Sequence, residues 1–176
     1  MALKPTIYKA RINLSDLDRE VYDALNLTVA QHPSESLERM LVRVIAFCIQ
    51  AQPDLNFTKG LSETNEPDLW VKTLDEQISL WCDVGEPSPE RLKKASHQAK
   101  SVTVFSFNQK SDVWWQQNGR KIASLGVVVY QLNFDEIMVL AQTVGRAIDW
   151  SVTITGQTAY IHTESQEVQV SWTQLT

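Results

Sequence analysis

The sequence predicts a mixed α+β fold in one domain spanning residues 1–176. Two observations support this class: short β-type runs alternate with segments of helical period, and the middle of the chain has the order helix, three strands, helix, strand. With 43% hydrophobic and 21% charged residues, the composition is that of an ordinary soluble globular protein. A domain of this length buries roughly two-thirds of its unfolded surface, so we expect it to be stable without disulfides or a structural metal.

The amino-terminal third predicts a hairpin followed by a helix. The runs "TIYKARINL" and "REVYDALNLTVAQ" are rich in alternating, β-branched and aromatic residues, which favours two paired strands. The next segment, "HPSESLERMLVRVIAFCIQ", predicts a helix that has Pro33 in its first turn and Glu35 and Glu38 near the positive end of its dipole. Its apolar positions share one face at helical spacing and are Leu37, Met40, Leu41, Val44, Ile45 and Cys48.

The central region predicts three strands, a second helix and a fourth strand. The short runs "LNF", "DLWVKTL" and "ISLWCDVG" are separated by turn-like segments, which favours antiparallel neighbours. In "SPERLKKASHQAK", Ser88 can cap a helix whose first turn accepts Pro89 and Glu90. The run "SVTVFSF" then predicts a buried strand.

The carboxy-terminal third predicts a connection, a strand, a helix and two closing strands. We expect "NQKSDVWWQQNGRK" to be a polar connection with a turn at Asn118-Gly119, followed by the strand "SLGVVVYQL". The segment "FDEIMVLAQTVGRAI" predicts a helix whose inward residues are Ile137, Leu140, Ala141, Val144 and Ile148. The runs "WSVTITGQTAYIHT" and "EVQVSWTQL" predict two final strands that close the domain as antiparallel edges.

Charge, cysteine use and hydropathy limit the classes of function. The net charge of −5 argues against nucleic-acid binding by the whole surface, but it allows a local basic groove. Cys48 and Cys82 lie in apolar segments without metal-binding spacing, which predicts buried thiols in a reducing cytoplasm and no zinc site. No apolar run reaches the ~18 residues of a membrane span, and "MALKPTIYKA" lacks the apolar part of a signal peptide. We therefore expect a cytoplasmic protein without a membrane partner.

Two aspartates on neighbouring predicted strands form the main candidate site. Because side chains alternate along a strand, a hairpin of "DLWVKT" and "SLWCDVG" with aligned faces brings Asp68 close to Asp83. Two such carboxylates repel unless a cation joins them, and hard oxygen ligands favour Mg²⁺ or Mn²⁺. The carbonyl oxygen of Val84 is a candidate third ligand. A metal held there would activate water or polarise a phosphoryl oxygen.

Turn chemistry is the alternative explanation for the same residues. Residues 65–68 are all of types that are common in turns, and Asp83 stands two residues before Gly85 at a strand end. From spacing alone, both interpretations stay open.

Four long segments resemble the bacterial YaeQ family. They are "TIYKARINL", "HPSESLERMLVRVIAF", "LNFTKGLSETNEPDLW" and "WCDVGEPSPERLKKASHQAKSVTVFSF", and their order matches over nearly the whole chain. The resemblance implies a variant of the PD-(D/E)XK nuclease fold. This fold is a mixed sheet with a restriction-endonuclease-like α-β-β-β-α-β core, here with an extra amino-terminal hairpin and carboxy-terminal strands. The resemblance also favours the metal interpretation.

The nuclease pattern carries over to this sequence in part. Pro67 and Asp68 match its "PD", and Asp83 matches its second acid. The pattern requires a lysine two residues after that acid, but this chain has Gly85, which can neither transfer a proton nor carry charge. The departure puts catalysis in doubt.

In some relatives of that superfamily the lysine comes from the neighbouring helix. The resemblance therefore makes Lys94 the catalytic candidate, with Lys93 as the alternative and Gln98 as a supporting polar group. Helical spacing places Lys94 one turn from Arg91, His97 and Gln98. The competing interpretation for both lysines is a solvated helix surface.

An acid on the first helix is the remaining catalytic candidate. The nuclease core often carries an acid there, and "PSE" looks like the matching segment, which selects Glu35. Acids in a first helical turn are also favoured by the dipole without any function. For His32 and His97, both a place at the site and a structural role stay open.

Basic and aromatic residues suggest nucleic acid as a partner. The candidate basic set from the two helices is Arg39, Arg43, Arg91, Lys93, Lys94 and Lys100. Trp70 and Trp81 would share a sheet face with the aspartates, and Trp114 and Trp115 are expected to be exposed in the polar connection. Such rings stack on bases, although aromatics in strands more often belong to the core.

Two functions follow from these residues. The first is a Mg²⁺-dependent phosphodiesterase or nuclease in which Asp68, Asp83 and the Val84 carbonyl hold the metal, Lys94 steadies the attacking water or the phosphate, and Glu35 tunes the site. The second is an interaction module that keeps the core without hydrolysis and binds nucleic acid or a protein, for example in transcription. The missing lysine favours the second, and the retained aspartates favour the first.

Overall fold

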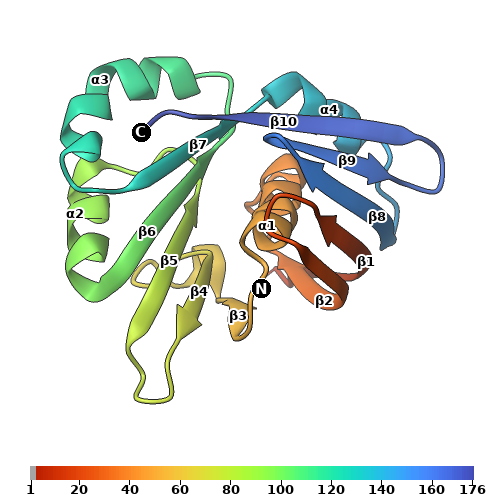
Figure 1. Cartoon of the computed structure of the whole chain (residues 1–176), viewed down its shortest axis with the longest axis horizontal. Coiled ribbons are helices and arrows are strands. Elements are labelled where there is room, and N and C mark those ends of the chain that lie inside the picture. Colours follow the sequence, from red (N-terminus) through yellow and green to blue (C-terminus); the bar gives the residue numbers. More distant parts are fainter. Residues whose placement is uncertain (1–2) are drawn as a thin grey trace. The chain divides into compact units, whose positions relative to one another are not determined.

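The computed structural model describes residues 3–176, which form two compact units (Figure 1). The first unit contains the described residues up to Ala51 together with Asn133–Trp172, and the second contains Gln52–Leu132 and Thr173–Thr176. The described residues form ten strands, four α-helices and one short 3-10 helix. The predicted α+β class is confirmed, whereas a single domain over residues 1–176 stays a prediction. No helix in residues 3–176 combines the length and the apolar character needed to cross a bilayer.

The first unit is built on five strands and two helices. In spatial order its strands are β2 (Val21–Gln31), β1 (Thr6–Asp16), β8 (Ala147–Thr155), β9 (Thr158–His162) and β10 (Glu167–Gln174). Its helices are α1 (Leu37–Gln50) and α4 (Phe134–Ala141). Strand β1 pairs antiparallel with β2 and parallel with β8. The predicted amino-terminal hairpin is therefore confirmed.

The second unit also has five strands. In spatial order they are β7 (Val128–Leu132), β6 (Ala99–Ser106), β5 (Ile78–Val84), β4 (Leu69–Lys72) and β3 (Leu55–Phe57). Its helices are α2 (Pro89–Gln98), α3 (Ser111–Ala123) and the 3-10 helix η1 (Gly60–Ser62). Strands β5, β6 and β7 are parallel, and β4 is antiparallel to β5. The chain order α1-β3-β4-β5-α2-β6 agrees with the predicted order.

Helix α1 is the buried helix of the first unit. Five residues of the predicted face are each at most 2% exposed: Met40, Leu41, Val44, Ile45 and Cys48. The sixth, Leu37, is half-buried, and burial extends beyond one face because every residue from 40 to 48 is buried. The helix begins at Leu37, because the Ser36 side chain caps it by accepting a hydrogen bond from the Arg39 amide at 3.1 Å. Placing Pro33 in the first turn was therefore wrong, and Glu35 precedes the helix.

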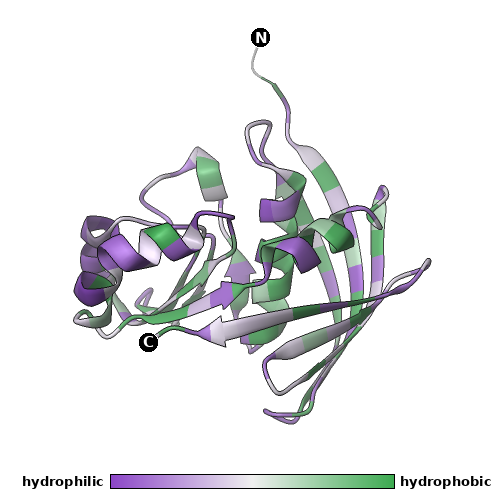
Figure 2. Ribbon diagram, turned by 90° about the horizontal axis from the view of Figure 1, so that it is seen from above, coloured by the Kyte–Doolittle hydropathy of each residue, from purple (hydrophilic) through white to green (hydrophobic). Residues whose placement is uncertain are grey.

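Helices α2 and α3 cover one face of the second sheet. The apolar cluster beneath them contains Trp81, Leu92, Ala95, Val102, Val104, Ile122, Val127 and Val129. Helix α2 contributes Leu92 and Ala95 to this cluster, and its remaining positions are mainly hydrophilic (Figure 2). Helix α2 therefore contacts the sheet through a small apolar face.

Helix α3 replaces the polar connection that the sequence predicted. Its Asn118-Gly119 pair is helical, because the helix packs its fully buried Ile122 into the apolar cluster. Gly119 lies so near Trp115 that a Cβ there would be 2.9 Å from the ring. Trp114 and Trp115 are half-buried, with ring centres 5.8 Å apart. The predicted turn and the predicted exposure of these two rings were wrong, since packing overrode the local turn preference.

The carboxy-terminal elements also differ from the prediction. Helix α4 ends at Ala141, and Ile148 is instead a buried residue of β8. The predicted strand over residues 150–163 is two strands, β8 and β9, joined by a tight turn in which Gly156 and Gln157 both have positive φ. Strand β8 lies between β1 and β9 and is parallel to β1, so it is not an antiparallel edge.

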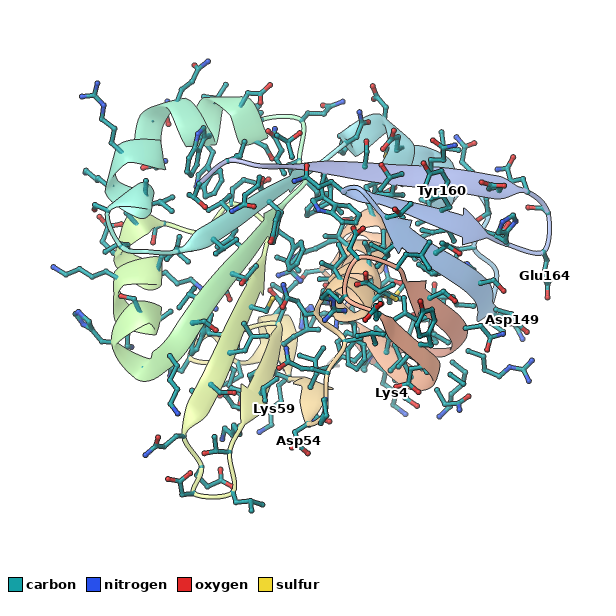
Figure 3. The ribbon with its side chains drawn as sticks, viewed as in Figure 1. Lys4, Asp54, Lys59, Asp149, Tyr160 and Glu164 are labelled. Atoms are coloured by element: carbon teal, nitrogen blue, oxygen red, sulfur yellow. The ribbon has the colours of Figure 1, made fainter. Side chains whose placement is uncertain are left out.

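Arginine side chains fasten the hairpin to its neighbours in the first unit. Arg19, in the β1–β2 turn, donates from Nε to Oδ2 of Asp16 at 2.7 Å and from Nη1 to the Ala51 carbonyl at 3.0 Å. A cation is favoured at that place because the carbonyls at the end of α1 lack helical partners. On β1, Arg11 forms an ion pair at 3.0 Å with Asp149 of β8, and Asp149 is labelled in Figure 3.

Replacing Gly119 with alanine should destabilise the protein by about 1–3 kcal/mol, because the new methyl group overpacks the Trp115 ring. This reverses the usual gain of ~1 kcal/mol for alanine over glycine in a helix. Urea unfolding measures the change. Gln117→Ala, at an exposed position of the same helix, is the matched control and should leave the midpoint nearly unchanged. A stabilised Gly119→Ala variant would contradict this packing.

Burial raises the pKa of the Cys48 thiol to about 12. In the unfolded chain the pKa of a cysteine thiol is about 8.5. At a pH between the unfolded and the folded pKa, the unfolded state has therefore lost a proton that the native state retains. The stability that the native protein has while both states keep the Cys48 proton is complete below the unfolded pKa. It is lost as the pH rises toward the folded pKa, at about 1.4 kcal/mol per pH unit. Urea unfolding from about pH 9 to 11 should show a shallower decline for Cys48→Ala than for the wild type. Equal slopes would contradict a buried, neutral thiol.

Candidate functional site

Two buried aspartates lie at the β4–β5 pair. Leu69 of β4 is opposite Cys82 of β5, and the Asp68 amide donates to the Cys82 carbonyl at 2.9 Å. Asp68 is 5% exposed and Asp83 is 2% exposed. The predicted antiparallel pairing of these strands is confirmed, and it brings the two aspartates to adjoining positions on neighbouring strands.

Arg91 of α2 binds both carboxylate oxygens of Asp83. Its Nε donates to Oδ2 at 2.8 Å and its Nη2 to Oδ1 at 3.0 Å, which is the two-point geometry of a strong charge-assisted pair. The same guanidinium donates to the carbonyls of Thr64 at 2.6 Å and Glu66 at 2.9 Å. It also lies 5.6 Å from the centre of the Trp81 ring. The protein thus supplies its own cation for Asp83.

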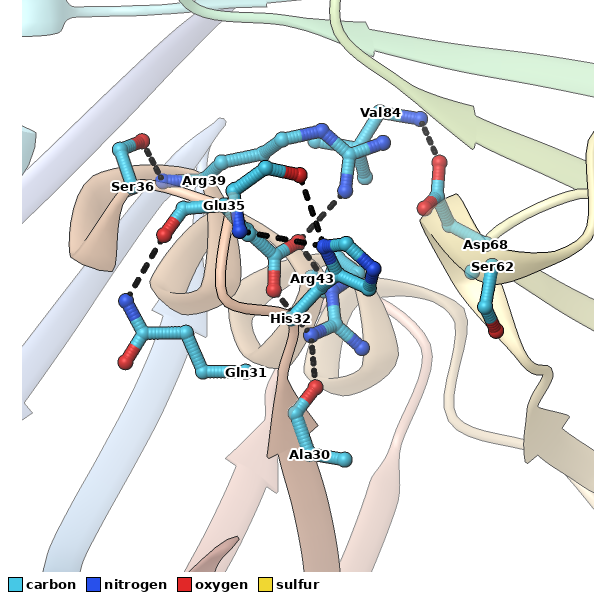
Figure 4. A network of polar contacts seen from close by, with 12 residues as sticks. Ala30, Gln31, His32, Glu35, Ser36, Arg39, Arg43, Ser62, Asp68 and Val84 are labelled. Atoms are coloured by element: carbon cyan, nitrogen blue, oxygen red, sulfur yellow. Dashed lines mark hydrogen bonds and ion pairs between the residues drawn. The ribbon is translucent and has the colours of Figure 1, made fainter. Parts of the chain in front are cut away.

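Asp68 is held from two directions. Its Oδ2 accepts a hydrogen bond from the Val84 amide at 2.8 Å (Figure 4). Thr58 fastens the loop before it, because the Thr58 hydroxyl donates to the Pro67 carbonyl and the Thr58 amide donates to the Asp68 carbonyl at 3.2 Å. Pro67 and Asp68 therefore combine an anchored turn with a buried carboxylate. The contact that Val84 makes here is through its N–H, and a metal-ligand role for its carbonyl stays a prediction.

The carboxylate oxygens of Asp68 and Asp83, as they are bonded here, do not fit the ligand set of a hard divalent cation. Such an ion needs several oxygen ligands, whereas both Asp83 oxygens are occupied by a guanidinium and one Asp68 oxygen by an amide. In the part of the chain that the structure describes, no group of three or more His, Cys, Asp or Glu residues is arranged to hold a metal. A metal at the pair would have to displace Arg91.

Gly85 occupies the position where the nuclease pattern has lysine. Its φ is +115°, a conformation that L side chains rarely adopt, so a lysine there would be strained. Its amide donates to the Phe105 carbonyl of β6 at 2.9 Å, which fixes the end of β5 against its neighbour. The backbone conformation at this position therefore favours glycine over the lysine of the nuclease pattern.

Glu86 organises the start of α3. Its Oε1 accepts hydrogen bonds from the amides of Phe107 at 3.1 Å and Asn108 at 3.0 Å and from the Ser111 hydroxyl at 2.5 Å. A carboxylate at a helix amino terminus is favoured by the dipole and by the unpaired amides there. This acid therefore serves the framework of the second unit.

The helical candidates Lys94 and Gln98 lie on the exposed face of α2, as does the alternative Lys93. Within residues 3–176, the side chains of these three residues make no hydrogen bond or ion pair with the protein. Arg91, one turn before Lys94, turns toward Asp83 instead. Helix α2 thus brings an arginine to the acidic pair, and a catalytic role for Lys94 or Gln98 stays a prediction.

Glu35 belongs to the first unit and lies just before α1. Its buried carboxylate accepts hydrogen bonds from Arg39 Nη1 at 2.6 Å and from Arg43 Nη2 at 2.6 Å (Figure 4). Arg43 also donates to the Ala30 carbonyl at 2.7 Å, and the Gln31 side chain donates to the Glu35 carbonyl at 2.9 Å. Glu35 therefore joins β2 to α1 through ion pairs, and its tuning role in catalysis stays a prediction.

The two histidines that were candidates for the site, His32 and His97, have different surroundings. His32 Nδ1 accepts a hydrogen bond from the Ser34 amide at 3.1 Å and lies 2.7 Å from the Ser34 hydroxyl, in the loop before α1. His97 is exposed in the last turn of α2. His32 thus has a local structural role in the turn.

The pKa of the Cys82 thiol is affected by burial and by the charge of the acidic pair. Its pKa is raised well above the ordinary value, first by burial and then by the negative charges of Asp83 and Asp68. A buried thiol of this kind is neutral and unreactive. Cys82 is therefore a packing residue.

Sequence reasoning missed the roles of Arg91 and Glu86. It grouped Arg91 with the surface basic residues, and it gave Glu86 no role. A signal was present, since β5 carries Asp83 as its last residue but one and Arg91 lies in the first turn of the next helix. Only the folded chain reveals that the two side chains meet.

The fold and the site define a mixed α+β protein with two buried aspartates, one just before β4 and one in the neighbouring strand β5, where an arginine binds it. The sequence pattern of the YaeQ protein family matches residues 1–172, so the chain belongs to the YaeQ family. It is 35% identical over 175 residues to the uncharacterized protein YaeQ of Escherichia coli K12, covering 98% of this chain and 97% of that protein. It is 40% identical over 156 residues to the Salmonella typhi YaeQ protein, covering 88% and 86%.

Two crystal structures of YaeQ proteins resemble this chain closely. The protein from Xanthomonas axonopodis pv. citri superposes with a TM-score of 0.93 at 30% identity and covers 97% of both chains. The protein from Pseudomonas syringae also has a TM-score of 0.93, at 35% identity, and covers 98% of this chain and 96% of that one. The family assignment thus holds for sequence and fold.

Arg91→Ala should lower the free energy of unfolding by about 3 kcal/mol, because Asp83 would stay buried without its cation. Urea unfolding measures this loss, and Arg120→Ala, at an exposed position of α3, is the control and should change little. In an Asp83→Asn background the cost of Arg91→Ala should fall clearly. An equal cost in both backgrounds would show that the pair is not coupled.

Proposed function

We propose that this chain is an interaction module that binds its partner without metal-dependent hydrolysis. The observation that carries the proposal is the two-point pair between Arg91 and Asp83. A fixed internal cation neutralises the acid that would otherwise attract Mg²⁺ or Mn²⁺. In this proposal the acidic pair stabilises the fold and does not bind the metal that hydrolysis would need.

The absent lysine supports the same conclusion. Metal-assisted hydrolysis in the nuclease pattern needs a positive side chain beside the second acid, where this chain has Gly85 in a glycine-favouring conformation. The proposed substitute, Lys94, is exposed on α2. Two parts of the catalytic arrangement are therefore replaced by framework residues.

The same proposal accounts for the PD-(D/E)XK resemblance. The order α1-β3-β4-β5-α2-β6 is the one that the resemblance implies for a restriction-endonuclease-like core, and Asp68 and Asp83 are the residues that the resemblance assigns to its two acids. In this proposal the core and its acids are kept because they hold the β4–β5 pair, the preceding loop and α2 together. The activity of such a core does not follow from its fold.

A Mg²⁺-dependent phosphodiesterase or nuclease is the second candidate function. One observation favours it, namely the burial of Asp68 and Asp83 at adjoining positions on neighbouring strands. In this alternative, Lys94 and Gln98 would assist at the acidic pair and Glu35 would tune it. Arg91 would first have to leave Asp83, because the observed donor set does not fit the metal.

Calorimetric titration with Mg²⁺ and Mn²⁺ tests the proposal directly. The wild type should bind neither ion at millimolar concentrations, because Arg91 already neutralises Asp83. Labelled single- and double-stranded DNA and RNA should stay intact with either ion. Gel analysis of the labelled strands detects cleavage.

Matched variants identify the source of any activity. Asp68→Asn and Asp83→Asn remove the acidic pair, and Asp75→Asn removes an exposed acid from the β4–β5 turn as a control. Metal-dependent cleavage that is lost in the first two variants and kept in the control would overturn the proposal. Loss of that cleavage in Lys94→Gln would further support the hydrolase.

A further inference from the structure

Seven of the sixteen basic residues of the chain fall within residues 91–121, together with one acid, Asp112. Arg91 is the exception among them in being bound to a buried carboxylate. Five others lie on α2, on α3 or at the start of β6, and we call them the basic surface: Lys93, Lys94, Lys100, Arg120 and Lys121.

All five side chains of the basic surface are exposed. Within residues 3–176, none of them makes a hydrogen bond or an ion pair with the protein. The arginines that hold buried acids are different residues, so the basic surface is not needed to neutralise the interior. Its charge is therefore available to a partner.

The topology of the second unit gathers the basic surface on two neighbouring helices. Helices α2 and α3 each connect parallel strands, so both run back along the same sheet face and end where β6 and β7 begin (Figure 1). They pack on a shared apolar cluster through Leu92 and Ile122. Arg120 and Lys121 lie in the last turn of α3, and Lys100 is the second residue after the end of α2.

The aromatic residues near the basic surface distinguish between kinds of nucleic acid. Single strands are bound by exposed rings on which bases stack. Trp114 and Trp115 are half-buried against the core, and the Trp114 indole N–H donates to the Pro87 carbonyl at 2.9 Å. In residues 3–176 the one aromatic ring among the exposed large hydrophobic side chains is Tyr22, in the first unit. The basic surface therefore offers positive charge without a stacking platform.

We propose that the basic surface binds the phosphate backbone of a nucleic-acid duplex without reading its base sequence. The inference rests on the proposed function, since it names the partner of the interaction module. Lysine and arginine side chains contact phosphates as point charges and release counterions, so the affinity depends steeply on salt. The excess negative charge elsewhere on the chain limits contact with the duplex to this surface.

Fluorescence anisotropy with a labelled duplex of about 20 base pairs measures this binding at several salt concentrations. In EDTA and low salt, the wild type should bind duplex DNA or duplex RNA more tightly than a single strand of the same length. Replacing Lys93 and Lys94 together with Gln should weaken binding by about tenfold or more and reduce the salt slope by about 2. Gln keeps the helical propensity of these exposed positions, so the fold should be unchanged.

Lys59→Gln is the matched control, because Lys59 is exposed in the same unit and lies near β3 and β4, away from α2 (Figure 3). It should bind the duplex like the wild type. Absence of duplex binding at low salt overturns the inference, as does equal binding by the double variant. Tighter binding to single strands, to vesicles of anionic lipid or to polyglutamate than to duplexes overturns it as well.

Two separate measurements distinguish duplex binding by the basic surface from hydrolysis at the acidic pair. Binding is measured in EDTA, and cleavage is measured separately with Mg²⁺ or Mn²⁺. Cleavage by the wild type would reject the proposed function whether or not the basic surface binds. A chain that neither cleaves nor binds a duplex would reject only the present inference.

Discussion

The ion pair between Arg91 and Asp83 is the interaction on which the second unit depends. One guanidinium joins the end of β5, the first turn of α2 and the loop carbonyls of Thr64 and Glu66. Two of its donors bind the Asp83 carboxylate and the remaining hydrogen bonds reach the loop carbonyls. The planar fork of arginine fits the carboxylate in a way that lysine cannot. A single side chain thereby fixes the loop that precedes Asp68, the end of the strand that carries Asp83, and the helix between β5 and β6.

Arginine is used in the same way at other buried acids. Arg19 binds Asp16 and the end of α1, and Arg43 binds Glu35 and the Ala30 carbonyl. Burying a carboxylate is costly unless a partner neutralises it and satisfies its lone pairs. The arginines with buried partners thus belong to the framework, whereas the lysines of α2 remain at the surface. This division separates the residues that hold the fold from those that can meet a partner.

Much of the fold could be predicted from local patterns, but several elements could not. The apolar period of α1 and the cap at Ser88 identified two helices, and the alternation of residues identified the hairpin and the β4–β5 pair. Helix α3 was missed because Asn118-Gly119 is a turn signal in isolation, while its packing partners come from distant strands. The parallel pairing of β1 with β8 joins segments far apart in the chain, and no local pattern encodes it.

For the site, the sequence by itself determined the family, the closeness of Asp68 and Asp83 at the β4–β5 pair, and the absence of lysine at Gly85. Side-chain alternation and residue identity suffice for those statements, because they depend on neighbours along the chain. The tertiary structure decided that Asp83 is neutralised by Arg91, that Glu35 is held by Arg39 and Arg43, and that Lys94 stays exposed. These facts depend on which helix face and which loop carbonyl meet a given strand end. That is a matter of three-dimensional packing, which the spacing of residues in one chain does not specify.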